Sequence, residues 1–207
     1  MEYEKYVVPI LASNEHYKLT DCDYNGTGFI VGEYLITAGH VVAGFNYVGY
    51  KFDGKIHLLS KLDFLELGIK EYSRYNQISI DTSLKEDMAL FKIGECGSPL
   101  RFSFKEDDMS CMYYGYSLKN DSTVVVDRID SILISSELNT GNKTAINCKE
   151  LKCNAFHRGN SGGPLFHDDL IVGMLVSATE TTKRCLSSWY MQDKICSIKN
   201  NKLELCS

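Results

Sequence analysis

The chain has 207 residues and a formal net charge of −5 at pH 7, from 22 basic and 27 acidic side chains. Its composition, 44% hydrophobic and 11% aromatic with only 3 prolines, excludes a disordered tail or linker, because such a chain buries enough apolar surface to offset its ordering entropy. No run of lysine and arginine is dense enough to follow a phosphate backbone, so the sequence argues against a nucleic-acid partner.

The first segment of the chain lacks the features of an export signal. Its apolar run, from Tyr6 to Leu11, is broken by Pro9 and follows acidic residues, whereas a signal peptide has a basic start and a longer apolar stretch. No other segment approaches the roughly 20 apolar residues that span a bilayer. We therefore expect an intracellular protein without a membrane partner, in the cytoplasm or, if the protein is viral, in the cytoplasm of its host cell.

Short strand-like runs separated by turns dominate the rest of the chain. In chain order the predicted strands cover 28–32, 34–39, 88–93, 111–116, 122–135 and 170–178. The predicted turns lie at 23–26, 53–54, 94–99 and 139–142. This pattern is typical of an all-β sandwich or barrel. The Gly/Ser/Pro cluster at 94–99 is the best interior boundary, so we predict two domains, 1–95 and 96–207.

The C-terminal region changes character. Ser188–Met191 is predicted to form a last strand. Asp193 then serves as the N-cap of a predicted short helix that runs to Ile198.

The eight cysteines predict free thiols, since disulfides are rare in a reducing compartment. They stand at positions 22, 96, 111, 148, 153, 185, 196 and 206. Cys148 and Cys153, with His157 and His167 downstream, do not match the spacing of a structural zinc site. We expect neither a metal ion nor another cofactor.

Three segments carry residues suited to nucleophilic catalysis. His40 follows an apolar strand that ends in small residues, and Asp87 directly precedes the apolar run Met88–Lys92. Ser161 lies among glycines in the run from Gly159 to Pro164. A serine hydroxyl needs a base to take its proton, and an imidazole works best as that base when a carboxylate fixes its tautomer.

The glycines around the serine suggest how the reaction is assisted. Without side chains, the segment lets a substrate carbonyl reach Ser161 and lets backbone N–H groups turn inward. The N–H groups of Gly159 and Ser161 are the predicted oxyanion hole. Taken singly, each segment also has a structural interpretation: a Gly-rich turn, a histidine at a strand end, an aspartate in a turn. All three segments in the order His, Asp, Ser occur together by chance much less often than any one of them alone.

These residues resemble the signature segments of the trypsin-like serine peptidases. The matching segments are Thr37–His40, Asp87–Leu90 and Gly159–Leu165, and the likeness is greatest to HtrA-type and other bacterial or viral intracellular members. It covers residues 26–178 in outline. The resemblance implies two packed antiparallel β-barrels of the chymotrypsin-like fold. It places His40 and Asp87 on the first barrel, in 1–95, and Ser161 on the second, in 96–207, which ends in the short helix. No PDZ-like segment is expected after residue 178.

One departure from the family concerns activation. Secreted digestive members resemble one another in a cleaved N-terminus whose new amine pairs with an aspartate just before the nucleophile. Asn160 occupies that position here. We therefore expect a site formed on synthesis, or ordered by an activating partner or a loop movement, without that cleavage.

The resemblance also locates the substrate pocket. It implies walls from the segment Ala155–Arg158 and from the strand carrying Val176, Ser177 and Ala178, which would pair with the substrate backbone. Ala155 stands where members selective for basic residues carry an aspartate, so cleavage after lysine or arginine is disfavoured. His157 and Arg158 either attract an acidic side chain or are solvated loop residues.

The leading hypothesis is a serine endopeptidase that forms an acyl-enzyme on protein or peptide substrates, regulated and narrow in its targets. The alternative is a catalytically silent binding module with the same fold. Metal-dependent hydrolysis would need a ligand motif such as HExxH, which the sequence lacks.

Overall fold

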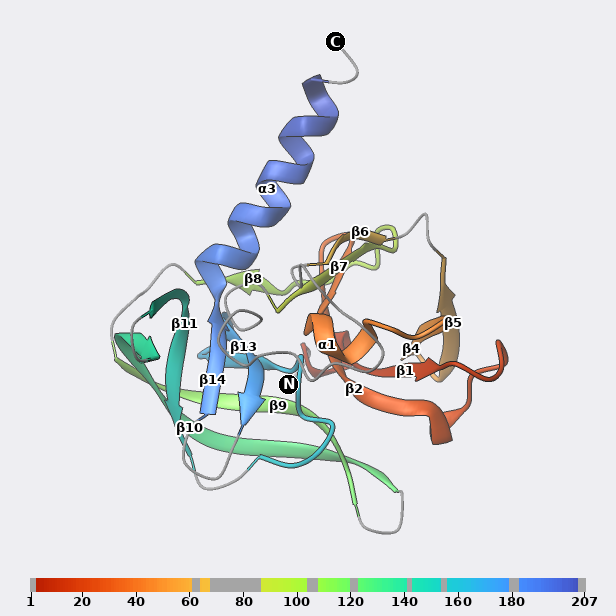
Figure 1. Ribbon diagram of the computed structural model, residues 1–207, viewed down its shortest axis with the longest axis horizontal. Coiled ribbons are helices and arrows are strands. Elements are labelled where there is room, and N and C mark those ends of the chain that lie inside the picture. The colour runs from red at the N-terminus through yellow and green to blue at the C-terminus, as the bar shows by residue number, and fades with distance from the viewer. Residues whose placement is uncertain are drawn as a thin grey trace.

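The residues that the structure describes form mainly two seven-stranded β-sheets and one long C-terminal helix (Figure 1). The computed structural model describes residues 3–60, 64–67, 87–103, 108–119, 123–140, 143–153, 156–178 and 183–204. Among these residues, no helix is both long and apolar enough to cross a bilayer.

The first sheet is built from the N-terminal part of the chain, and all its strand pairs are antiparallel. Its strands are β1 (Val7–Ser13), β2 (Tyr24–Val31), β3 (Tyr34–Thr37), β4 (Tyr47–Phe52), β5 (Lys55–Leu59), β6 (Phe64–Leu67) and β7 (Ala89–Lys92). Their order in space is β5-β4-β1-β2-β3-β7-β6. The 3₁₀ turn η1 (Glu4–Tyr6) precedes β1, the 3₁₀ turn η2 (Asp21–Asp23) lies between β1 and β2, and the short helix α1 (Gly39–Val42) lies between β3 and β4.

Strand β1 lies inside this sheet although it contains Pro9. A proline has no N–H to donate and is normally confined to sheet edges. Pro9 pairs with Thr27 of β2, while the pairing with β4 begins one residue later, at Ile10. Because β4 does not reach Pro9, no ladder bond is lost there, and the proline is tolerated.

The second sheet closes on itself. Its strands are β8 (Arg101–Phe102), β9 (Met109–Leu118), β10 (Val124–Thr140), β11 (Lys143–Lys152), β12 (Pro164–His167), β13 (Leu170–Ala178) and β14 (Lys183–Ser187). The order is β12-β9-β10-β11-β14-β13-β8, and β12 also pairs with β13, which completes a barrel of six strands. The expected all-β fold of two packed barrels is confirmed, with the first barrel open among the described residues.

One hydrophobic core runs through both sheets. Phe29 and Leu90 of the first sheet belong to the same buried cluster as Phe166 and Met174 of the second. A separate cluster that includes Tyr113 fills the closed barrel. The two sheets are therefore packed against each other by side chains that are almost completely buried, which fixes the relative position of residues that each sheet carries.

One predicted turn is confirmed and another is wrong. Asp53 and Gly54 form the β4–β5 turn with φ values of 49° and 73°, as expected for an Asp-Gly hairpin. The prediction of a turn at 23–26 is wrong, since β2 already begins at Tyr24. The chain passes from the first sheet to the second between β7 and β8; the domain boundary at residue 95 stays a prediction.

The C-terminal helix α3 covers Ser188–Glu204 and runs away from the second sheet (Figure 1). The prediction of a strand at 188–191 is wrong, and Asp193 lies inside the helix instead of capping it. The buried Ser188 hydroxyl donates to the Ser103 carbonyl at 2.6 Å where the helix begins. Met191 and Ile195 are buried on one face, four residues apart, which is the spacing of a helix and not of a strand.

Candidate active site

His40 lies at the end of the first sheet, in α1. Strand β3 ends at Thr37, and Ala38 and Gly39 are buried where the chain turns into the helix. From β2, the Asn25 side-chain amide donates to the Val41 carbonyl at 2.6 Å. This bond fixes the short helix, and with it the position of the histidine.

Asp87 reaches His40 because β3 and β7 are neighbours. Thr37 pairs with Ala89 in the antiparallel ladder. Extending that register by two residues places Asp87 opposite Gly39, next to the histidine. Forty-seven residues separate His40 and Asp87 along the chain, and the sheet brings them together.

The Asp87 carboxylate binds His40 at two points. Its Oδ1 accepts the His40 backbone N–H at 2.8 Å, and its Oδ2 lies 2.6 Å from the ring Nδ1. A carboxylate can only accept, so Nδ1 carries a proton and Nε2 is the basic nitrogen. The Asp87 side chain is only 5% exposed, and the His40 side chain is 34% exposed.

These surroundings set the pKa of His40. Burial by itself lowers the pKa of the imidazole, but the negative charge and the hydrogen bond of Asp87 act against it. The net effect is a pKa above the ordinary 6.5. His40 is thus a somewhat stronger base than a free histidine.

The loop that carries Ser161 belongs to the second sheet but docks on the first. The Ser161 carbonyl accepts the N–H of Thr27 on β2 at 2.9 Å. On the other side, Gly162 donates to the Leu175 carbonyl on β13 at 2.7 Å, and Leu175 donates to Gly163 at 2.9 Å. The loop therefore spans the junction between the sheets.

Ser161 and α1 meet at a glycine on β2. A Cβ on Gly26 would lie 2.6 Å from the Val41 side chain and 3.1 Å from the Ser161 carbonyl oxygen, so only glycine fits there. Val41, the residue after His40, and Ser161, the proposed nucleophile, thus both lie close to Gly26. In the described part of the chain no hydrogen bond joins the Ser161 hydroxyl to the His40 ring. Such bonds are often long in a free enzyme and shorten with substrate bound.

The orientation of the peptide groups around Ser161 is fixed by their carbonyls. The Arg158 carbonyl accepts the Leu118 N–H at 2.9 Å, and the Asn160 carbonyl accepts the Tyr113 hydroxyl at 2.8 Å. In a trans peptide the next N–H points the opposite way. The N–H groups of Gly159 and Ser161 therefore point away from these donors, and neither has a partner among the described residues. Backbone N–H groups without a partner are one requirement of an oxyanion hole.

Sequence reasoning missed two residues of the first sheet that hold this loop. The Tyr24 hydroxyl donates to the Gly159 carbonyl at 2.8 Å, and the Thr27 hydroxyl lies 3.1 Å from the same oxygen. Burial raises the pKa of Tyr24 well above its usual value, so the phenol keeps its proton. Thr27 lies within the region of resemblance, which begins at residue 26, and Tyr24 lies outside it. Their contacts with Gly159 join the two sheets, so the sequence carries no signal for those contacts.

The residues predicted to bind substrate are only partly described. Ala155 lies outside the described residues, as do the side chains of Ser177 and Ala178. The Val176 side chain is buried in the core between the sheets, so its backbone alone can meet a substrate. Beyond Leu175, this part of β13 has no strand partner on the side facing Gly162 and Gly163, among the described residues.

Other predicted features are less connected to the site. His157 and Arg158 are both exposed. None of the cysteines whose side chains the structure describes forms a disulfide: Cys22, Cys96, Cys111, Cys153, Cys185 and Cys196. No group of three or more His, Cys, Asp or Glu side chains that could hold a metal ion occurs in the described ranges.

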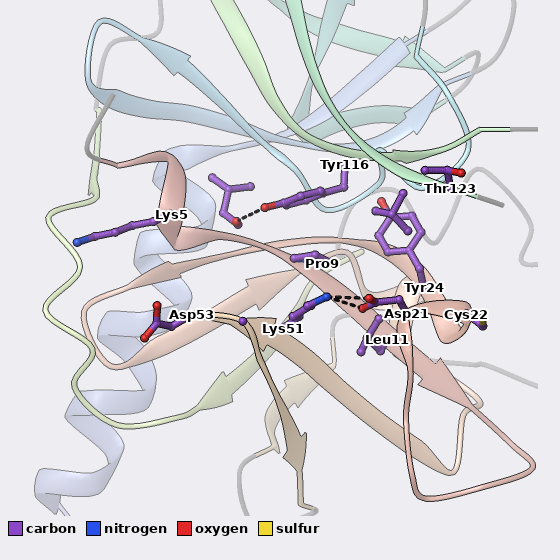
Figure 2. A pocket seen from close by; sticks show the side chains of 13 residues that line it. Lys5, Pro9, Leu11, Asp21, Cys22, Tyr24, Lys51, Asp53, Tyr116 and Thr123 are labelled. Atoms are coloured by element: carbon purple, nitrogen blue, oxygen red, sulfur yellow. Dashed lines mark hydrogen bonds and ion pairs between the residues drawn. The ribbon is translucent and has the colours of Figure 1, made fainter. Parts of the chain in front are cut away.

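A pocket of about 600 Å³ lies elsewhere, between β1, the β4–β5 turn and the ends of β9 and β10 (Figure 2). An ion pair of 2.8 Å joins Lys51 and Asp21 in its wall. Tyr24 and Tyr116 line it, but His40, Asp87 and Ser161 do not. The candidate site is therefore identified by its chemical groups and not by this pocket.

Comparisons with known proteins give the family and the fold of the chain. The model of the trypsin family matches residues 5–190. No curated protein matches the sequence significantly. The active form of the Rv3671c protease from M. tuberculosis is similar in fold, with a TM-score of 0.64 and 18% identity over 95% of this chain and 82% of that one. The inactive form gives 0.61 and 18%, over 95% and 90%. The HtrA-type protease AlgW with a decapeptide gives 0.64 and 14%, over 95% and 65%.

Proposed function

We propose that this chain, which belongs to the trypsin family of serine peptidases, cleaves internal peptide bonds through an acyl-enzyme on Ser161. One observation carries the proposal: Asp87 binds both the backbone and the ring of His40 beside the strand on which the Ser161 loop docks. A base with a fixed tautomer and a serine in a glycine-rich turn are the parts that acyl transfer needs.

In the first half of the reaction, the Ser161 hydroxyl oxygen attacks the carbonyl carbon of the scissile bond. His40 Nε2 takes the hydroxyl proton, and Asp87 stabilises the resulting imidazolium. The N–H groups of Gly159 and Ser161 bind the negative oxygen of the tetrahedral intermediate. His40 then gives its proton to the amine, the carbon–nitrogen bond breaks, and the acyl group stays on Ser161.

In the second half, water replaces the departed amine. His40 takes a proton from the water as its oxygen attacks the ester carbon, and the same two N–H groups bind the new oxyanion. When the intermediate collapses, the proton passes to the Ser161 oxygen, and a carboxylic acid leaves. The chain's own residues supply every proton transfer.

The substrate binds as an extended strand in this proposal. The backbone of Val176–Ala178 on β13 supplies the pairing edge, and Ala155 lies in the wall of the pocket for the side chain before the scissile bond. Support comes from the lack of a partner for this part of β13 on its Gly162 side within the described residues. Because Ala155 brings no negative charge, the pocket disfavours lysine and arginine.

The active site forms without N-terminal cleavage in this proposal. Asn160 makes its hydrogen bonds within the folded chain, which supports a site that forms without N-terminal cleavage. If only a chain cut near residues 20–30 were active, this idea would be wrong. We further infer a narrow set of target proteins. We also infer a cytoplasmic location, which the described cysteines support because none of them forms a disulfide.

A catalytically silent binding module is the competing function. The specific observation on its side is that Ser161 and His40 share no hydrogen bond in the described structure. All three residues needed for turnover are nevertheless in place in the sequence, so we rank this function second.

Mapping of new N-termini separates the two functions. The chain is co-expressed with candidate substrate proteins, and the N-termini that arise are sequenced by mass spectrometry. A peptidase creates new N-termini that disappear with Ser161→Ala and persist in the presence of chelators. A binding module creates none. Indiscriminate cleavage would contradict the narrow target range while leaving the peptidase function intact.

A further inference from the structure

Asn160 lies between the two residues whose N–H groups form the proposed oxyanion hole, and its side chain leads to an acidic residue on another strand. We propose that Asp127 of β10 is a positioning residue for this hole and acts through Asn160. The inference rests on the proposed function and names a residue that no sequence motif contains. It explains how a glycine-rich loop keeps one conformation without an N-terminal amine.

The Asn160 side chain is fully buried and uses its hydrogen-bonding groups in three directions. Its Nδ2 donates to the Asp127 carboxylate at 2.9 Å and to the Tyr116 carbonyl at 2.7 Å. Its Oδ1 accepts the His157 N–H at 2.5 Å. Turning the amide over would set oxygen against two acceptors and nitrogen against a donor, so this orientation is the one that satisfies every group.

Asp127 faces the loop because of the alternation along β10. Ser131 and Leu133, on the same face as Asp127, are buried, whereas Arg128 and Asp130 on the opposite face are exposed. Asp127 itself is partly buried, so its carboxylate loses part of its hydration, which is costly unless hydrogen bonds replace it. The bond from Asn160 offsets that cost and ties β10 to the loop.

The loop needs such a tie because its own residues impose little. Gly159 and Gly162 have φ values of 94° and 87°, in a region that glycine enters and leaves freely. Between them, Asn160 is the residue with a side chain anchored in the barrel. If the Asp127 bond is lost, Asn160 keeps only its bonds with the Tyr116 carbonyl and the His157 N–H, so its side chain is held less tightly and the peptide groups on either side move more. The N–H groups of Gly159 and Ser161 then point to the oxyanion for less of the time.

The consequence is a loss in rate and not in affinity, because the hole acts on the developing oxyanion. The test is the reaction of Ser161 with a fluorophosphonate, whose phosphoryl oxygen also binds in the hole. The maximal labelling rate is measured separately from the half-saturating concentration. This probe requires no knowledge of the natural substrate.

Four variants separate geometry from charge. Asp127→Asn keeps an accepting oxygen in place and should stay within about 3-fold of the wild-type rate. Asp127→Ala removes the acceptor, and Asp127→Glu keeps the charge but displaces it. Each of these two variants should lower the maximal labelling rate by about 10-fold or more. This loss is a fraction of what a lost oxyanion donor costs. The half-saturating concentration of the fluorophosphonate should be the same in all variants. Asp130→Ala, on the outer face of the same strand, is the matched control and should behave as wild type.

Several results would overturn the inference. One is a wild-type rate for Asp127→Ala; another is an equal loss in Asp130→Ala. If Asp127→Ala does not fold, the contrast between Asp127→Glu and Asp127→Asn decides, and equal rates for that pair would count against it. If wild-type Ser161 is not labelled at all, the proposed function fails, and amide hydrogen exchange over residues 157–163 decides the positioning role. Faster exchange in Asp127→Ala than in Asp130→Ala supports it; equal exchange refutes it.

Discussion

Asp87 accepts hydrogen bonds from the backbone N–H and from the ring Nδ1–H of one residue, His40, at 2.8 and 2.6 Å. The first bond fixes the start of α1, and the second fixes the rotation of the ring. Because both acceptor oxygens belong to one buried carboxylate, the histidine is held at two points as a unit. The basic Nε2 is thereby presented in a fixed direction for proton transfer.

Substitution of Asp87 by asparagine should reduce turnover by about 10⁴-fold, the effect of losing the correct tautomer in triads of this kind. It should also shift the pH profile. His40 must be neutral to act, and its pKa is raised by Asp87, so wild-type activity falls as the pH drops through a value above 6.5. Without the carboxylate charge, burial lowers this pKa, and the acidic limb moves to lower pH. The measurement is kcat/KM against pH; an unmoved limb would contradict the role of Asp87.

Gly162→Ala should be one of the most damaging single substitutions in the chain. Gly162 has a φ of 87°, and a Cβ there would collide with the Thr27 carbonyl and the Thr37 hydroxyl. We expect a loss of at least about 3 kcal/mol in the free energy of unfolding, measured by urea titration. Gly32→Ala is the control: its φ is 59° with nothing within 4 Å of the added Cβ, so only backbone strain of about 1–2 kcal/mol remains. Equal losses would show that the contacts at Gly162 do not matter.

Tyr24→Phe tests the hold of the first sheet on the oxyanion loop. The change removes the hydroxyl that donates to Gly159 and leaves Thr27 as the remaining donor near that oxygen. The free energy of unfolding should fall by about 1 kcal/mol, and the rate of Ser161 acylation should fall a few-fold. Tyr17→Phe, at a side chain that is 69% exposed, should change neither quantity. An unaltered acylation rate in Tyr24→Phe would mean that the Thr27 hydroxyl alone suffices.

The selectivity of the pocket can be read from a peptide library. Ala155 offers no carboxylate to pair with a basic side chain, so cleavage after lysine and arginine should be rare. Ala155→Asp should raise cleavage after these residues relative to wild type, because it restores a negative charge where the family's basic-selective members have one. A wild-type profile dominated by lysine or arginine would place the pocket elsewhere.

The sequence was sufficient for those parts of the site that lie in contiguous motifs. His40, Asp87 and Ser161 are recognisable because each stands beside a short run with restricted side chains. Strands such as β2 and β13 were visible as apolar runs. The β3–β7 register brings Asp87 to His40, and the Ser161 loop docks on β2. Both depend on pairings between distant segments and have no local signal.

Other elements were missed for identifiable reasons. Strand β1 is buried on both faces and contains Pro9, so it shows neither alternation nor the usual composition of an inner strand. The aromatic residues at the start of α3 favour a strand by propensity. The spacing of Met191, Ile195 and Ile198 carries the helical period, but it becomes visible only in a window that crosses residue 191, where the predicted strand ends. The contacts of Tyr24 with Gly159 and of Asp127 with Asn160 join distant segments, and no one-dimensional pattern records them.

Covalent modification of Ser161 is the most direct test of the account. The purified protein is treated with diisopropyl fluorophosphate, and the modified residue is located by peptide mass spectrometry. We predict a single adduct on Ser161, much slower modification in His40→Ala, and no adduct in Ser161→Ala. An adduct that forms equally fast without His40, or that is found on another residue, would contradict the assignment of base and nucleophile.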